Sequence, residues 1–260
     1  MKTQSLKSRI QHIIPSLGYG VLCGLLTGTV IFFFKFAAKQ LEHLSRFLYE
    51  TAKESPLYIA FTFAILSLAA LTMILLHQKI PEVKGGGIPR SEGILRGRLN
   101  CRPIKTLIGT LFGSMISFLC GLPLGSEGPA VLIGTSLGKI CSASPNRIPW
   151  SRYVMTGGAG AGFAVATGAP LSAMLFALEE IHKRFTPLLI LTVSTSVLSA
   201  TYVNRLLCTL FSTEPHMLAI GQLAHFSLSD TGYLVLFGII LSPAVTLFDA
   251  SIEHFSKLTQ

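Results

Sequence analysis

The stretch Gly-Ser-Glu-Gly-Pro at residues 125–129 places one acidic residue, Glu127, between two long uncharged apolar runs. A carboxylate that stays ionised and unpaired in hydrocarbon costs several kcal/mol. The neighbouring residues suggest how this cost is offset, because Gly128 allows another group to approach the backbone and Pro129 suits the first turn of a helix. A helix that begins here would present backbone N–H groups and the positive end of its dipole to Glu127.

Spacing alone leaves two interpretations of Glu127 open. In the first, Glu127 and a dissolved anion compete for the same helix N-terminus, because such an end binds any anion. In the second, Glu127 is an interfacial glutamate just past the end of a spanning helix, and its carboxylate reaches the polar headgroups.

The composition of the 260-residue chain indicates a protein that crosses a membrane several times. Half of its residues are hydrophobic and 13% are charged, well below the roughly 25% charged that is usual in soluble domains. Uncharged runs long enough to cross a bilayer occur at 16–34, 57–76, 106–126, 153–178, 185–204 and 231–248. The 24 glycines and 13 prolines favour closely packed and interrupted helices. We therefore predict an all-α, multi-span membrane protein with interrupted helices.

The formal charge of +9 would suggest a nucleic-acid partner in a soluble protein. In a membrane protein it more simply reflects lysine and arginine in cytoplasmic loops, so we expect no nucleic-acid partner. The segment 79–105 holds seven basic and two acidic residues. The positive-inside rule then places residues 1–15 and 79–105 in the cytoplasm and the predicted loop 35–56 outside, in a multi-pass protein of the cell membrane.

A second glycine–proline cluster, Gly85-Gly86-Gly87-Ile88-Pro89, lies inside the basic segment. It predicts a permissive turn that leads into a second proline-started helix. On its own such a cluster usually indicates only a loop. Paired with residues 125–129, it suggests that two helix N-termini from interrupted helices converge on one anion near the membrane midplane.

The run 153–178 is rich in glycine and alanine and is broken at Gly168-Ala169-Pro170, which predicts two half-helices. It is followed by Glu179 and Glu180. Taken alone, this glutamate pair is more typical of an ordinary polar helix end at the membrane interface than of a functional site.

These residues resemble the family of CLC chloride channels and chloride–proton antiporters, over roughly residues 15–255. The order and spacing of four short elements carry the resemblance. They are Gly85-Gly86-Gly87-Ile88-Pro89 for the family's Gly-Ser-Gly-Ile-Pro, Pro103-Ile104-Lys105 for Pro-Val-Lys, Gly125-Ser126-Glu127-Gly128-Pro129 for Gly-Arg-Glu-Gly-Pro, and Ala169-Pro170-Leu171 with Phe176 and Glu179-Glu180 for Asn-Ala-Pro-Leu…Phe…Glu-Glu.

The resemblance implies a homodimer in which each subunit has its own anion pathway. The fold of each subunit would be built from two inverted-topology halves of tilted and interrupted helices. After a cytoplasmic segment 1–15, residues 16–255 would form a partial CLC-type transmembrane domain. It would contain the first half and one further helix, because the second half, with its Gly-x-Phe-x-Pro helix start, is missing from this sequence.

The resemblance also assigns roles to residues. Glu127 would be the external gate, whose carboxylate occupies an anion site until it is protonated or displaced, and Glu180 would be the internal proton-transfer residue. The anion-binding residues would be Gly86, Gly87, Ile88, Pro89, Gly125, Ser126, Gly128 and Pro129. Two of these depart from the family pattern: Gly86 stands in place of an anion-contacting serine, and Ser126 stands in place of an arginine beside the gate.

The function that follows is transport of chloride, or a similar small anion, across the lipid bilayer as a proton-coupled antiporter. A passive chloride channel of the same fold is the alternative, and Glu180 favours exchange over it. A third possibility is a truncated or split-gene half that does not transport alone. An enzyme is not expected, because the sequence shows no nucleophile–base set, phosphate loop or metal-ligand spacing. The five scattered cysteines indicate neither a disulfide framework nor a metal site, and no cofactor is expected.

Overall fold

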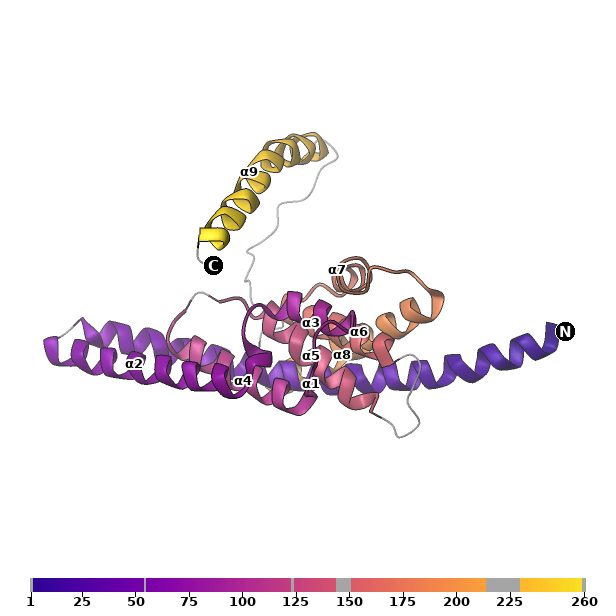
Figure 1. The fold of residues 1–260 in the computed structure, drawn as a ribbon, viewed down its shortest axis with the longest axis horizontal. Helices are drawn as coiled ribbons and strands as arrows, with labels where there is room; N and C mark the ends of the chain where they lie inside the picture. The colour runs from indigo at the N-terminus through magenta and orange to yellow at the C-terminus, as the bar shows by residue number, and fades with distance from the viewer. Residues whose placement is uncertain (1, 54, 123, 144–150, 214–229, 259–260) are drawn as a thin grey trace. The chain divides into compact units, whose positions relative to one another are not determined.

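The computed structural model describes residues 2–53, 55–122, 124–143, 151–213 and 230–258, in two parts that are considered separately (Figure 1). The described residues are helical and contain no strand. The first part consists of α1 (Lys2–Ala52), α2 (Pro56–Lys79), the 3-10 turn η1 (Pro81–Val83), α3 (Gly87–Leu95), α4 (Pro103–Leu119), α5 (Glu127–Cys141), α6 (Ser151–Thr167), α7 (Pro170–Phe176), the π-helical turn η2 (Ala177–His182) and α8 (Pro187–Leu210). The second part is α9 (Asp230–Leu258).

Proline sets where four helices begin: α2, α4, α7 and α8 each start at a proline. The fixed φ of proline and its missing N–H suit the first helical position. The predicted break at 168–170 is confirmed, since α6 ends at Thr167, Gly168 adopts a φ of 75°, and α7 begins at Pro170. A single apolar run therefore forms two half-helices.

Helices α1, α5, α6 and α8 pack together in the first part, with α4 against α1 and α5 (Figure 1). Glycine allows the closest approaches. A Cβ on Gly134 of α5 would overlap the carbonyl of Gly158 on α6, and a Cβ on Gly158 would overlap the carbonyl of Gly134. Gly24 of α1 contacts the backbone of Ser196 on α8 in the same way. Such backbone contact between helices is typical of membrane proteins, in which small residues replace bulky ones at helix interfaces.

Four described helices are long and apolar enough to cross a membrane: α1 over Pro15–Ala52, α2, α8, and α9 over Asp230–Ile252. Helix α2 is the clearest example, because only 6% of its most apolar 18-residue stretch is buried inside the protein. Large apolar side chains such as Phe61 and Phe63 remain exposed on it. An exposed apolar surface of this extent is normal when the surrounding solvent is lipid.

The predicted end of the first span at residue 34 is wrong, as is the predicted loop over 35–56. Helix α1 continues without a break to Ala52. Residues 35–52 contain no glycine or proline that would end a helix. An ion pair one helical turn apart, between Arg46 and Glu42 at 2.7 Å, also lies on this stretch.

Two other helices do not coincide with the apolar runs of the sequence. The apolar run 106–126 is not one helix, because α4 ends at Leu119. Gly121 follows with a φ of 69°, and the N–H of Leu122 donates to the carbonyl of Ser117 at 3.2 Å, a frequent way of closing a helix. The last apolar run, 231–248, contains Pro243, which could be expected to interrupt a helix, but α9 continues through it. Between the runs 185–204 and 231–248 the sequence predicts an amphipathic, extramembrane piece up to about residue 230, of which residues 214–229 lie outside the described part.

Candidate functional site

The starts of α3 and α5 meet backbone to backbone, as the paired glycine–proline clusters predict. A Cβ on Gly87 would overlap the carbonyl group of Gly128. A Cβ on Gly128 would lie 3.6 Å from the nitrogen of Gly87, which is an ordinary contact. The sequence-based expectation was that Gly128 permits the close approach, but Gly87 is the residue that has to be glycine.

The start of α5 offers backbone donors at this junction. The first hydrogen bond of the helix runs from the N–H of Ala130 to the carbonyl of Ser126, at 3.0 Å. Pro129 has no N–H, so the amides of Glu127 and Gly128 precede the first helical bond and point out of the helix end. The helix dipole adds partial positive charge at the same place.

The start of α3 repeats this arrangement. The N–H of Arg90 donates to the carbonyl of Gly86 at 3.3 Å, and Pro89 lies in the first turn. The amides of Gly87 and Ile88 therefore occupy the corresponding positions at this helix end. Both helices begin two residues before their prolines rather than at them, which is a small correction to the predicted starts.

Glu127 is the first residue of α5 and not a residue outside it. Its side chain folds back, so that a Cβ on Gly125 would overlap the carboxylate oxygen Oε2. Glu127 is half-buried, whereas Ser126 beside it is buried, with an exposed fraction of 3%. The carboxylate thus lies at its own helix N-terminus, next to the junction with α3.

Glu180 lies in a different environment, on η2, where it is exposed. Its side chain is 57% exposed, and its Oε1 is 3.8 Å from the Nζ of Lys183. Lys183 also pairs with Glu92 of α3 at 3.0 Å, and Glu92 in turn pairs with Arg96 at 2.6 Å. The hydrogen bond from Lys183, together with the nearby arginines, holds the pKa of the Glu92 carboxyl below its ordinary value. Glu180 therefore belongs to a network of surface ion pairs.

Two contacts with α6 hold η2 in place. The ring nitrogen Nδ1 of His182 lies 2.9 Å from the hydroxyl of Thr156, and the ring of His182 meets that of Tyr153 edge-on at 5.4 Å. The turn then ends at Lys183, which adopts a left-handed backbone with a φ of 57°.

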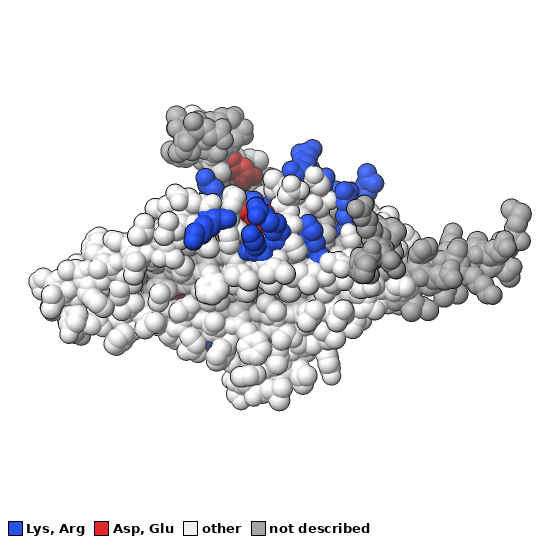
Figure 2. All heavy atoms as spheres, turned by 60° about the horizontal axis from the view of Figure 1, so that its bottom comes forward, with Lys and Arg blue, Asp and Glu red and all other residues white. Residues whose placement is uncertain are grey.

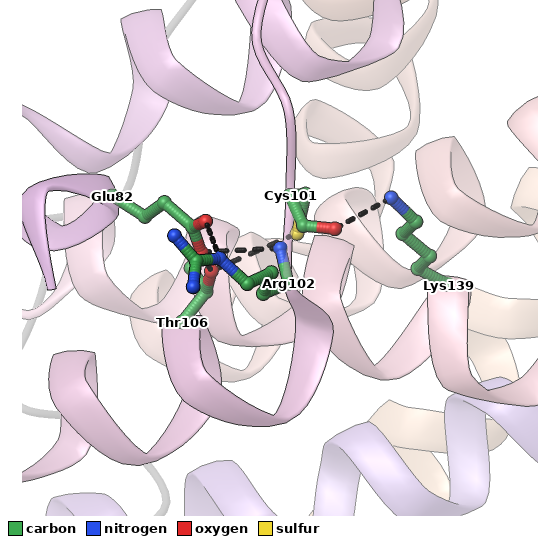
Figure 3. A network of polar contacts seen from close by, with 5 residues as sticks. All are labelled: Glu82, Cys101, Arg102, Thr106 and Lys139. Atoms are coloured by element: carbon green, nitrogen blue, oxygen red, sulfur yellow. Dashed lines mark hydrogen bonds and ion pairs between the residues drawn. The ribbon is translucent and has the colours of Figure 1, made fainter.

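A polar network at the opposite end of α5 was not anticipated from the sequence (Figure 3). The buried carboxylate of Glu82 on η1 accepts hydrogen bonds from the hydroxyl of Thr106 at 2.7 Å and from the backbone N–H and Nε of Arg102 at 3.1 and 2.9 Å. Next to it, the Nζ of Lys139 donates to the carbonyl of Cys101 at 2.7 Å (Figure 3). These contacts tie the start of α4 to η1 and to the C-terminal turn of α5.

The pKa of Glu82 reflects two opposing effects. Burial disfavours the charged form and raises the pKa, but the hydrogen bonds from Thr106 and Arg102 and the charge of Arg102 outweigh it. The net result is a pKa below the ordinary value. In the sequence Glu82 was counted only as an acid in a basic loop; the Pro81 before it and the Pro103 at the start of α4 were the signals that ordered turns lie here.

Lys35 is a second residue that the sequence analysis missed. Its Nζ donates to the carbonyl of Val165 on α6 at 2.8 Å, and it lies within electrostatic reach of Glu127. It was assigned to an outer loop because the first span was ended at residue 34. The apolar residues 36–38 that follow it were the signal that the helix continues.

The described lysine and arginine side chains are unevenly distributed over the face drawn in Figure 2. On the face drawn in Figure 2 they gather in one region, and a wide area beside it carries no visible cluster of charge. A surface with lysine and arginine gathered in one region beside a wide uncharged area is typical of a protein that lies partly in water and partly in lipid.

Comparisons with known proteins identify relatives along most of the chain. A family model described as voltage-gated chloride channel matches residues 68–260. The H(+)/Cl(-) exchange transporter ClcA of Cronobacter sakazakii is 32% identical over 195 residues, which cover 74% of this chain and 41% of that protein. ClcA of Vibrio cholerae is 29% identical over 196 residues, covering 75% of this chain and 42% of that protein. The chain thus spans about two fifths of the length of these curated relatives.

Solved structures agree with this result. A slow cyanobacterial Cl-/H+ antiporter superposes with a TM-score of 0.74 at 26% identity, covering 88% of this chain and 54% of that one. A eukaryotic CLC transporter shares the fold with a TM-score of 0.63 at 21% identity, covering 76% of this chain and 39% of that one. Together with the apolar helices, these matches identify a multi-pass membrane protein with the fold of CLC transporters. The chain belongs to the voltage-gated chloride channel family, the CLC family that its motifs resemble.

Proposed function

We propose that this chain forms part of the anion pathway of a proton-coupled chloride antiporter, with chloride or a similar small anion and protons as its substrates. The relatives named above are exchange transporters and an antiporter, which supports exchange over a passive channel. We expect it to work in the cell membrane, as a homodimer in the complete architecture, with no cofactor and no enzymatic reaction.

The observation that carries the proposal is the junction of α3 and α5. Two helix N-termini meet where Gly87 touches Gly128, and the Glu127 carboxylate lies beside them. Amides that point out of both helix ends provide fixed donors for an anion without any basic side chain. Gly86, Gly125 and Ser126 flank these donors, while Pro89 and Pro129 orient the two helix starts without donating a hydrogen bond.

In this proposal Glu127 is the external gate. Ionised, its carboxylate occupies the place of an anion and is held by the α5 amides and dipole. A permeant anion that enters the junction brings like charge beside the carboxylate, and this repulsion favours protonation of Glu127. The protonated side chain loses its attraction to the helix end and swings away. Anion entry and proton uptake are thereby coupled at one residue.

Glu180 is proposed as the internal proton-transfer residue. Its exposed carboxylate lies in a cluster with Lys183 and Glu92, where it is in reach of water. A group in this position can exchange protons rapidly with the cytoplasm and pass them toward the junction. Without such a group, the same junction would act as a passive chloride channel.

The test uses liposomes that contain this chain together with a polypeptide supplying the second half of the CLC fold. Chloride and pH are recorded simultaneously under opposing gradients. We expect Glu127→Gln to permit chloride movement without proton coupling, because glutamine cannot ionise. Uphill proton movement by Glu127→Gln would disprove its role as the gate. A fully active protein that never moves protons would instead indicate a channel, and a complex that moves neither ion would indicate a half that does not transport.

The orientation that we propose for the protein in the membrane follows from the basic segment 79–105. We place this segment in the cytoplasm together with residues 1–15. Single cysteines at positions 50 and 96 of a cysteine-free variant are treated in intact cells with a reagent that does not cross membranes. We expect labelling at position 50 and none at position 96. The reverse pattern would refute this orientation.

A further inference from the structure

Helices α5 and α6 run antiparallel in a register that places Val165 level with Glu127. A Cβ on Gly138 would contact Met155, one on Gly134 the carbonyl of Gly158, and one on Gly162 the carbonyl of Ala130. One further turn in the same register, three residues along each helix, pairs Glu127 with Val165. The C-terminal end of α6 therefore lies beside the N-terminal end of α5.

Lys35 reaches this level from α1. Its Nζ donates to the carbonyl of Val165 at 2.8 Å. Ile31 and Phe34, on the preceding turn of α1, belong to the same apolar cluster as Ala130 and Val165. The lysine stem is thus held among packed side chains, and the ammonium group is directed to one carbonyl.

The end of α6 favours a positive charge at this point. Helix α6 ends at Thr167, so the carbonyl of Val165 is one of the last four, which lack a partner within the helix. The negative end of the helix dipole lies at the same place. Lys35 satisfies this carbonyl. The register of α5 and α6 brings its ammonium group to the level of the Glu127 carboxylate, and opposite charges attract each other there.

The residue next to Glu127 supplies no such charge, because Ser126 is neutral. We propose that Lys35 is a positioning residue that supplies, from α1, the fixed positive charge opposite the Glu127 carboxylate and holds this gate in its ionised, closed state. The role as a gate rests on the proposed function, whereas the charge pairing can be tested without transport.

Other titratable groups lie on the described helices that pack against α5, and two of them donate hydrogen bonds to other partners. The guanidinium of Arg90 donates to the carbonyl of Lys84 at 2.8 Å, and the hydroxyl of Tyr49 donates to the carbonyl of Cys120 at 2.7 Å. Among the described side chains, these helices also carry Tyr19, Cys23, Lys39, Glu42, His43, Arg46 and Glu50 on α1, Glu92 in its ion pairs on α3, Lys105 at the start of α4, and Arg152 and Tyr153 at the start of α6. From α8, the thiol group of Cys208 lies in the neighbourhood of Lys35.

The test measures proton uptake by Glu127 in the full chain, reconstituted in lipid nanodiscs. Infrared spectra recorded against pH follow the carboxylic-acid band that disappears in Glu127→Gln. Removing the positive charge with Lys35→Gln, which keeps a donor for Val165, should make Glu127 take up its proton at a higher pH, by about one pH unit. Lys35→Arg keeps the charge and should leave the midpoint near that of the unmodified chain.

Lys39→Gln is the matched control, because Lys39 is an exposed lysine one turn farther along α1. It should not move the midpoint. An unchanged midpoint in Lys35→Gln, or an equal shift in Lys39→Gln, would overturn the proposal. A midpoint that shifts in a chain without measurable transport would support the charge pairing while the proposed function fails.

A reciprocal measurement covers the case in which Lys35→Gln does not fold. Coupling between two groups is mutual, so Glu127→Gln should make Lys35 release its proton at a lower pH. Nitrogen NMR of a chain labelled at lysine side chains follows this change, with the Lys35 signal assigned from Lys35→Arg. An identical titration of Lys35 with and without the Glu127 carboxylate would overturn the proposal.

Discussion

The two ends of α5 are held in different ways. At its N-terminal end, Gly128 rests directly on Gly87 of α3, with backbone against backbone. At its C-terminal end, Lys139 reaches the carbonyl of Cys101 through a long side chain, next to the ionic network of Glu82 (Figure 3). At the first end the contact is between two backbones, which no side-chain movement can adjust, whereas the contacts at the second end are made by side chains that can rearrange and recruit water.

This difference matches what each end has to do. An anion site made of backbone amides works only if two helix ends keep a fixed distance, and direct backbone contact provides this. The one flexible element at that end is the Glu127 side chain, which is the group proposed to move. At the other end, the network of Glu82 holds η1, the start of α4 and the end of α5 together through side chains, which requires less precision.

The largest effect is expected from Gly87→Ala. The new methyl group would collide with the carbonyl of Gly128, and neither backbone can move away without separating α3 from α5. We expect a loss of about 3 kcal/mol in the free energy of unfolding, at the upper end of what overpacking usually costs. Unfolding in mixed detergent micelles, followed by circular dichroism, measures it.

Gly128→Ala is the matched control for this variant. Its methyl group would meet the nitrogen of Gly87 at 3.6 Å, an ordinary contact. We expect the free energy of unfolding to change by less than about 1 kcal/mol. The helical preference for alanine over glycine stabilises the variant, and slight crowding offsets part of that gain. Equal effects of the two substitutions would mean that the junction is not packed as described.

A smaller effect is expected from Glu82→Gln at the other end of α5. The substitution removes the charge that accepts three hydrogen bonds from Thr106 and Arg102, which should cost roughly 1–3 kcal/mol at neutral pH. Thermal unfolding in detergent at pH 7 measures this difference. Arg102 itself is 62% exposed, so water can solvate it once its partner is lost.

The pH dependence distinguishes the charge from the shape of Glu82. Since its pKa is lowered in the folded protein, its contribution to stability is fully present above the unfolded value, about 4.3, and is lost as the pH falls through the folded pKa. The unmodified chain should therefore lose more stability than Glu82→Gln between pH 6 and pH 3. Parallel stability curves for the two proteins would contradict the assigned ionic role.

The sequence was informative where the backbone itself carries the signal. The breaks at Gly168 and Pro170 and the convergence of the two glycine–proline clusters follow from residues that restrict or free φ, and these local rules apply in any context. Glu127 was found because a lone acidic residue in an apolar run is costly in a membrane and therefore indicates a function.

The sequence was less informative where side chains from distant segments meet. Lys35 and Val165 are 130 positions apart, and no local pattern indicates which carbonyl a lysine will reach. The length of α1 was missed because charged residues were taken as the end of a span, although a helix can continue beyond the membrane into water. The roles of Glu127 and Glu180 stay predictions.

The smallest effect on stability is expected from Glu180→Gln, and here the expected change is in function. Glu180 is 57% exposed and 3.8 Å from Lys183, and exposed ion pairs contribute less than about 1 kcal/mol. The free energy of unfolding should therefore change by less than that amount, as for the neighbouring Glu179→Gln. In liposomes with the second half of the fold, Glu180→Gln should retain chloride movement and lose proton movement, whereas Glu179→Gln should keep both. Because Lys183 also binds Glu92, the cluster can persist without Glu180, so a large loss of stability would show that its carboxylate is structural and would refute a role in proton transfer alone.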